Sequence, residues 1–242
     1  MKNQAVSRDV TDFYNSEWKD HDYFFTLAFK DAIYYSYRLL GNVQGRKILE
    51  IGAGRGEQAV YLASLGAEVY VIDISKQSLQ EVERCAKNKH LQVTCALMNA
   101  EKMNYLEDEF DLVYINSVLM HTNHLLVLRE CSRVLKAGGK LIVIEPLQHT
   151  LFLQGYRLFS HYRLTKPQYM TFRKFKDGAS FFTSYNHTEF YFFACLFLPV
   201  FYLRIKWLYA FFFLAAKVDK ILLLLFPFLK FGAWVSVAEF RK

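Results

Sequence analysis

The fold of this 242-residue chain is decided by the stretch Lys47-Ile-Leu-Glu-Ile-Gly-Ala-Gly-Arg-Gly56, which is followed by Val69-Tyr-Val-Ile-Asp73. The apolar run before the first glycine is typical of a buried parallel strand. Three glycines then let the backbone turn tightly at the start of a helical pattern, where backbone N–H groups are exposed. The second strand ends in Asp73, 21 residues after Gly52, where an acid can accept hydrogen bonds from ribose hydroxyls. We predict a nucleoside site; an ordinary loop with a capping acid is the simpler alternative.

The spacing also bears on the kind of nucleoside. A dinucleotide fingerprint places its third glycine one residue later than Gly56, and Glu57 stands in that place. With Glu50 at the strand end, two acids surround the turn, which favours a ligand with positive charge and hydroxyls over one with phosphates. Here the chain resembles the class I S-adenosylmethionine (SAM)-dependent methyltransferases, whose first motif is E-x-G-x-G-x-G. The resemblance implies SAM as cofactor, and it implies contacts from Glu50, Gly52, Ala53, Gly54, Gly56, Asp73 and Ile74.

Further motifs of that family follow in the same order along the chain. Met98-Asn-Ala-Glu101 resembles the D-A-E element, which implies that Asn99, Ala100 and Glu101 address the adenine edge; a helix N-cap at Asn99 is the alternative. Asn116 and Ser117, at the end of the fourth strand, are two further candidate contacts to the cofactor. They lead into Val118-Leu-Met-His-Thr122, which is similar to V-L-H-H-[LT]. Arg129-Glu-Cys-Ser-Arg-Val-Leu-Lys-Ala-Gly-Gly139 is similar to R-E-x-x-R-V-L-K-P-G-G, and we expect a helix that stops at the glycines.

His121 is the first candidate for a general base, because in this fold the loop after the fourth strand faces the cofactor. Its rivals are Glu145, His149 and Tyr14, and a purely structural histidine is the alternative. In the aromatic N-terminal segment, Tyr14 and Tyr23 are the two tyrosines that we select as candidates for touching the ligand. No metal site is predicted, because His121 and His124 have no carboxylate or cysteine ligand set near them in sequence.

The resemblance implies a Rossmann-like α/β fold: a seven-stranded, mostly parallel sheet with helices on both faces and an antiparallel last strand. We expect cap helices in residues 1–44, a SAM-binding core in 45–146, and a substrate lid that completes the sheet in 147–242, all in one integrated domain. Phe182-Thr-Ser-Tyr-Asn-His-Thr-Glu189 resembles the family's helix start F-T-x-x-E-L. A helical apolar insertion precedes the last strand, predicted at 233–240.

Charge and hydrophobicity divide the chain. Residues 1–146 carry 17 Lys/Arg and 19 Asp/Glu, a net charge of −2, whereas residues 147–242 carry 13 and 4, a net charge of +9. Four unpatterned cysteines and a polar N-terminus without a signal-peptide pattern lead us to expect a cytoplasmic protein. Apolar runs within 190–231 are interrupted by lysines and arginines, so we expect peripheral membrane contact rather than a membrane span. A lid around an apolar pocket explains them equally well.

These features predict a SAM-dependent methyltransferase that acts on an apolar or lipid-tailed small molecule through O- or C-methylation. Twenty of the 62 residues from Phe181 onward are aromatic, which suits such an acceptor. Two alternatives stay open: an RNA or other nucleic-acid methyltransferase that uses the basic C-terminal part, and a SAM-binding protein without catalysis. A nucleic-acid partner is disfavoured because the basic charges are scattered among aliphatic runs. The oligomeric state cannot be read from the sequence.

Overall fold

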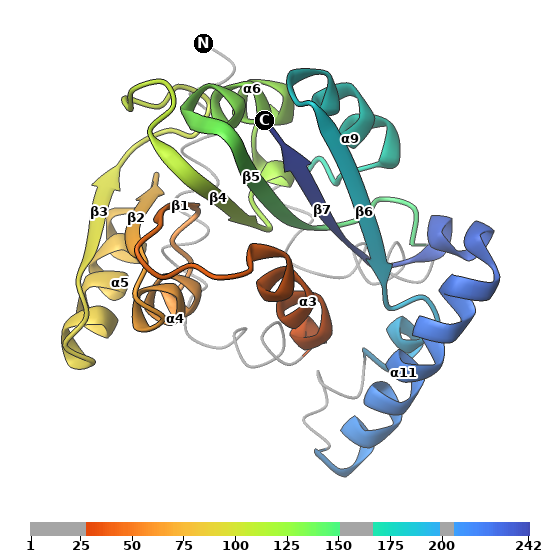
Figure 1. Ribbon diagram of the computed structural model, residues 1–242. Coiled ribbons are helices and arrows are strands. Elements are labelled where there is room, and N and C mark those ends of the chain that lie inside the picture. The colour runs from red at the N-terminus through yellow and green to blue at the C-terminus, as the bar shows by residue number, and fades with distance from the viewer. Residues whose placement is uncertain (1–27, 151–166, 199–205) are drawn as a thin grey trace.

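A computed structural model of the protein describes residues 28–150, 167–198 and 206–242. Seven strands form one sheet in the order β3-β2-β1-β4-β5-β7-β6 (Figure 1). Strands β1 to β5 pair in parallel, and β7 is antiparallel to both of its neighbours. This confirms the expected seven-stranded Rossmann-like sheet. Its strands are β1 (Lys47–Ile51), β2 (Glu68–Asp73), β3 (Val93–Leu97), β4 (Phe110–Asn116), β5 (Leu135–Pro146), β6 (Ser184–Phe190) and β7 (Val235–Arg241).

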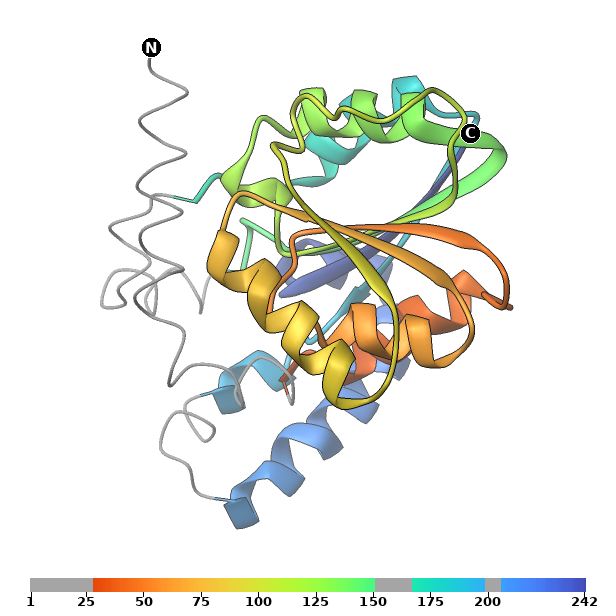
Figure 2. The ribbon, with the colours of Figure 1, turned by 90° about the vertical axis from the view of Figure 1, so that its left-hand side faces the viewer.

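Helices cover both faces of the sheet (Figure 2). One face packs against α3 (Lys30–Leu40), α4 (Glu57–Ser64) and α5 (Lys76–Asn88), and the other packs against α6 (His124–Val134) and α9 (Phe172–Gly178). The parallel strands are apolar along almost their whole length because both of their faces are covered. The chain order reverses between β1 and β4, and parallel sheets bind ligands at the carboxyl ends of the strands beside such a reversal.

Two details of the predicted secondary structure were wrong. The segment from Phe182, expected to begin a helix, enters strand β6, which pairs with β7 along its full length. The helix expected to stop at the glycines ends at Val134, because Leu135 already pairs with Phe110 of β4. Gly138 and Gly139 lie inside β5, where the register with β4 shifts and Gly138 adopts a φ of 73°. Pairing with neighbouring strands outweighed the local sequence signal in both places.

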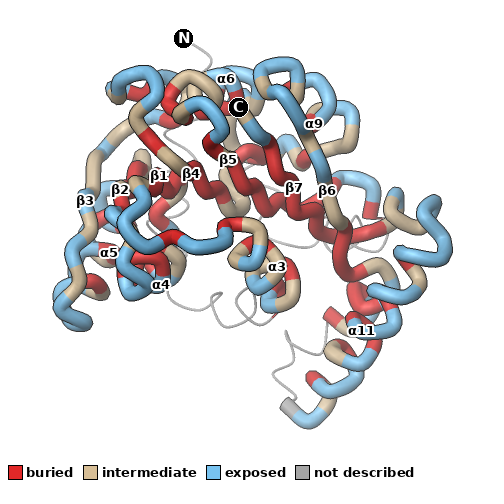
Figure 3. The backbone as a smooth tube through the Cα atoms, viewed as in Figure 1, coloured by how far each residue is buried: buried red, intermediate tan, exposed pale blue. Residues whose placement is uncertain are grey.

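The described parts of the apolar segment between β6 and β7 are largely helical, as expected. They contain η3 (Ala194–Phe197), η4 (Lys206–Leu208), the long helix α11 (Tyr209–Leu225) and η5 (Pro227–Gly232). Figure 3 shows α11 with buried residues along one side and exposed residues along the other. Among the residues that the structure describes, no helix is long and apolar enough to cross a membrane.

Candidate functional site

The glycine turn after β1 is held in place by the acid at the end of β2. Asp73 accepts the backbone N–H of Ala53 on Oδ2 and that of Ser75 on Oδ1, both at 2.7 Å. The Ser75 side chain then caps α5 by accepting the N–H of Ser78. Each carboxylate oxygen has a second lone pair, so Asp73 keeps acceptor capacity for ribose hydroxyls while it fastens the turn to the start of α5.

Gly52 and Gly54 of the turn differ in their steric surroundings. Gly52 has a φ of 88°, and a Cβ built there would lie 2.3 Å from Cγ2 of Val118, so the loop after β4 closes directly over it. Gly54 has a φ of 47°, and its Cβ would meet nothing within 4 Å, so the open side of the turn is at Gly54. A ligand can therefore approach the backbone most closely at Gly54.

Glu50 is buried at the end of β1 on the same side of the sheet as Asp73. Burial raises the pKa of the Glu50 carboxyl well above its usual value, and the charge of Asp73 raises it further. Burial also raises the pKa of Asp73, although the N–H groups that it accepts oppose that shift. Among the described residues, Oε2 of Glu50 has no hydrogen-bond partner. Two desolvated acids, one with an unused oxygen, favour a ligand that brings positive charge and hydroxyl donors.

The loop after β3 carries the residues predicted to address adenine. Asn99 is exposed, and its Oδ1 accepts the N–H of Glu101 at 2.8 Å; a turn follows instead of a helix, so the N-cap alternative was wrong. Ala100 is buried, and Oε1 of Glu101 accepts the N–H of Asn123 at the start of α6. The N–H of Met98 donates to the carbonyl of Asp73, which brings this loop next to the glycine turn.

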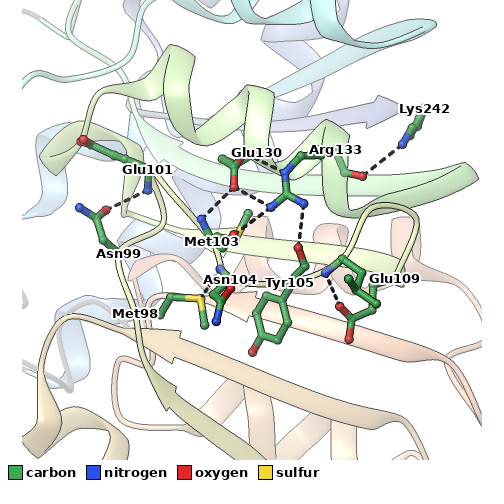
Figure 4. Close-up of polar contacts among 11 residues, drawn as sticks. Met98, Asn99, Glu101, Met103, Asn104, Tyr105, Glu109, Glu130, Arg133 and Lys242 are labelled. Atoms are coloured by element: carbon green, nitrogen blue, oxygen red, sulfur yellow. Dashed lines mark hydrogen bonds and ion pairs between the residues drawn. The ribbon is translucent and has the colours of Figure 1, made fainter.

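Arg133 and Glu130 of α6 clamp the far part of the same loop (Figure 4). Glu130 accepts the N–H of Met103 at 2.8 Å, and Arg133 donates to the carbonyls of Met103 and Tyr105 at 2.9 and 2.7 Å. The two side chains also pair with each other at 2.8 Å. Sequence reasoning missed this clamp. Its signal was the three-residue spacing of Glu130 and Arg133, which places both on one face of a helix.

His121 lies half-buried on η1 (Leu119–His121), the short helix that follows β4. Burial lowers its pKa to about 4, so the imidazole is neutral near pH 7 and able to accept a proton. Asn116 and Ser117 precede it at the end of β4, where the Ser117 hydroxyl donates to Oδ1 of Asn116 and the Ser117 backbone has a φ of 59°.

Glu145, the first rival base, holds this loop. It is fully buried at the end of β5, and its Oε1 accepts the N–H of Leu119 at 2.6 Å. Burial raises its pKa to about 8, against the opposing effect of the backbone N–H groups of η1. His149 is exposed just beyond β5, and Tyr14 and Tyr23 lie outside the described residues. Within the described parts of the chain, no group of three or more His, Cys, Asp or Glu side chains could hold a metal ion.

Comparison with known proteins agrees with this geometry. Residues 49–143 match a family described as a methyltransferase domain. The demethylmenaquinone methyltransferase of Geobacillus sp. (strain WCH70) is 33% identical over 135 residues, which cover 52% of this chain and 56% of that protein. The ubiquinone biosynthesis O-methyltransferase of Alkalilimnicola ehrlichii is 34% identical over 110 residues, 45% of this chain and 44% of that protein. The chain therefore spans about half the length of these curated relatives.

Solved structures share the fold. Phosphoethanolamine N-methyltransferase 2 of Haemonchus contortus, in complex with SAM, superposes with a TM-score of 0.67 at 17% identity, over 96% of this chain and 59% of that one. Geranyl diphosphate C-methyltransferase from Streptomyces coelicolor A3(2) gives a TM-score of 0.61 at 16% identity, over 87% and 79%. The strand order, the glycine turn with its two acids and the match over residues 49–143 agree: this part of the chain has the fold and the family match of a SAM-dependent methyltransferase domain.

Proposed function

We propose that this protein transfers the methyl group of SAM to a carbon or oxygen atom of an apolar, quinone-like small molecule. The observation that carries the proposal is the desolvated acid pair Glu50 and Asp73 beside the glycine turn. The unused oxygen of Glu50 and the spare acceptor capacity of Asp73 suit a ligand that is cationic at one end and carries hydroxyls at the other. The residues present therefore fit SAM. The quinone-methylating relatives support the class of acceptor.

Three parts of the chain have distinct roles in this reaction: Asp73, the loop at Asn99 and His121. Asp73 holds the turn and would accept hydrogen bonds from the ribose hydroxyls of SAM, and the loop at Asn99 and Ala100 would address its adenine. When bound, SAM supplies a methyl group that is already activated on a sulfonium, so catalysis depends mainly on positioning the acceptor in line in a water-poor site. As the acceptor atom gains the methyl group, an imidazole nitrogen of His121 takes the proton that this atom loses.

Charge contacts argue against an RNA acceptor. Several C-terminal cations already pair with carboxylates: Lys220 with Asp31 at 3.1 Å, Arg241 with Glu239 at 2.7 Å, and Lys242 with Asp108 at 2.7 Å. Proteins that follow a nucleic-acid backbone use rows of cations that remain available to phosphates. The paired cations of this chain do not support that use.

An acceptor with a lipid tail partitions into membranes, so the enzyme has to bind it there. We place the protein in the cytoplasm, in reversible peripheral contact with a membrane through residues 190–231. The helical segment there exposes large apolar side chains, and its lysines can approach anionic headgroups.

Turnover measured with labelled SAM tests the proposal. The protein is incubated with a demethylated, isoprenoid-tailed quinone in its reduced form, with a tail-free analogue, or with RNA. We expect methylated quinone and S-adenosylhomocysteine (SAH) in equal amounts, less product from the tail-free analogue, and none from RNA. Tight SAH binding without methylation of any phenol or quinone would make the chain a SAM-binding protein without this activity.

A further inference from the structure

Helix α11 is apolar on the side that faces solvent as well as on the side that faces the protein. Its buried side packs onto η3 and the core through Tyr209, Phe212, Ala215 and Ala216. Six further apolar residues recur every three or four positions on the opposite side: Phe211, Leu214, Val218, Ile221, Leu225 and Phe228. We name these six the outer stripe; five of them belong to α11, which Figure 3 shows with exposed positions along its length, and Phe228 belongs to η5.

The outer stripe is unusually exposed for its composition. Leu214 and Ile221 are each 60% exposed, and Phe228 is 67% exposed. Single exposed apolar residues are common on proteins, but a continuous row of them marks a surface that contacts something apolar. Since α11 is already anchored by its other side, the outer stripe is not needed for its packing.

Within residues 206–232, every charged side chain except that of Asp219 is a lysine. Lys217 is exposed at its edge, and Lys220 reaches Asp31 with a side chain that is still 55% exposed. The one acid of the segment, Asp219, is buried and accepts the N–H groups of Phe193 and Ala194 at 2.8 and 2.9 Å. A partner that covers the outer stripe therefore meets apolar side chains bordered by cations.

We propose that the outer stripe rests on an anionic lipid surface, with Lys217 against the headgroups. An apolar row with basic flanks is the arrangement by which helices lie in the membrane interface. A symmetric contact between two copies would bring the same lysine edges toward each other, which opposes self-association. A lipid surface supplies both the apolar medium and the negative charge.

The outer stripe ends near the carboxyl edge of the sheet. Beside Phe228, Lys230 lies 3.7 Å from Glu189 at the end of β6, and the ring of Phe231 contacts that of Phe172 with centroids 5.4 Å apart. Docking would bring the lipid surface to the edge where parallel strands bind ligands. This location would help catalysis only if the acceptor is apolar, as proposed above. The docking of the outer stripe on lipid does not depend on that proposal.

Vesicle flotation of the 242-residue chain tests the docking without acceptor or SAM. We expect recovery with phosphatidylglycerol vesicles at low salt and much less with phosphatidylcholine vesicles. The triple variant Leu214→Gln, Ile221→Gln and Leu225→Gln should bind at least about tenfold more weakly. Its matched control changes three exposed leucines elsewhere, Leu65→Gln, Leu97→Gln and Leu106→Gln, and should float like the native protein.

Charge reversal gives a second, gentler test. Lys217→Glu should weaken binding to anionic vesicles by at least about fivefold, since each basic residue near such a surface contributes about that factor. Lys87→Glu, an exposed lysine on α5, is its control. Light scattering and SAH titration run beside the flotation. The proposal is overturned if the native protein stays with the unfloated fraction, or if it is a dimer that the triple glutamine variant converts to a monomer. Retained SAH binding in either case would leave the methyltransferase proposal standing.

Discussion

The carboxyl group of Glu145, at the end of β5, accepts the backbone N–H of Leu119 at 2.6 Å. This hydrogen bond joins two neighbouring strand ends, because Leu119 opens the short helix that carries His121. The preceding residue, Val118, packs on Gly52 of the glycine turn. One buried acid thus fixes the loop that touches both the proposed cofactor site and the proposed base.

Glu145→Gln should change the pH dependence of stability. The pKa of Glu145 is about 8 in the fold, above its ordinary value of 4.5, so between these values the folded state keeps a proton that the unfolded state has released. Its contribution to stability is therefore full below pH 4.5 and is lost as the pH rises through 8. Glutamine can still accept the Leu119 N–H and does not titrate. In urea unfolding, the free energy of unfolding of the variant minus that of the native protein should rise by about 3–5 kcal/mol between pH 4.5 and pH 8. A difference that stays the same across this range contradicts the assignment.

Asp73→Ala should weaken SAH binding and loosen the glycine turn. The variant loses an acceptor for ribose hydroxyls, and the N–H groups of Ala53 and Ser75 lose their partner. We expect a loss of roughly 1.5–3 kcal/mol in SAH affinity by calorimetry, with a lower Tm. Glu68→Ala at the opposite end of β2 is the control, because Glu68 is exposed and should leave SAH affinity unchanged. Equal affinities of the native protein and the Asp73 variant would remove Asp73 from the site.

Arg133→Ala should release the loop that carries Asn99. Two carbonyls lose a charged donor, and Glu130 loses its partner, so we expect a stability loss of about 1–3 kcal/mol. Backbone hydrogen exchange should become faster over residues 98–106. The loss of SAH affinity should be larger than the loss of global stability alone explains. Arg133→Lys keeps the charge but not the two-pronged geometry and should rescue only part of the loss.

The matched control for this clamp is Arg84→Ala. Arg84 also pairs with a glutamate three residues away, Glu81, but both are exposed on α5 and hold no loop. Surface pairs of this kind contribute little, so Tm and SAH affinity should stay close to native values. If both arginine variants behave alike, the Arg133 clamp does not position the loop.

The cofactor half of the fold could be predicted because its signals are local. Residues 47–73 combine glycines at positive φ, two apolar strands and an acid at a fixed spacing. Together these signals specify the strand–turn–helix–strand arrangement that the structure has. The role of Asp73 was predicted only in part, since its bonds to Ala53 and Ser75 depend on two strand ends meeting in space.

The C-terminal part was harder to predict because its structure depends on distant partners. Strand β6 forms where the sequence resembles a helix start, since β7, some fifty residues later, offers it a full row of backbone partners. Glu145 was selected in the sequence only as a candidate base; its contact with Leu119, 26 residues away, shows that it also supports the loop, and its role as a base stays a prediction. The exposure of the outer stripe likewise depends on which side of α11 packs against the core. Both sides are apolar, so the sequence alone does not determine this.

His121→Ala should lower turnover on an apolar acceptor at least about tenfold and leave SAH affinity intact. The pKa of His121 lies at about 4 because the site is desolvated, so the imidazole is already neutral far below pH 7. A histidine with its ordinary pKa of 6.5 would instead lose activity as the pH falls from 8 to 6. We therefore expect the kcat/KM of the native enzyme to show no histidine titration between pH 8 and pH 6. His124→Ala, on the next helix, is the control and should keep turnover within a few-fold of native. A rate loss centred near pH 6.5 that disappears in the His121 variant would show that the base titrates normally and that its site is open to water.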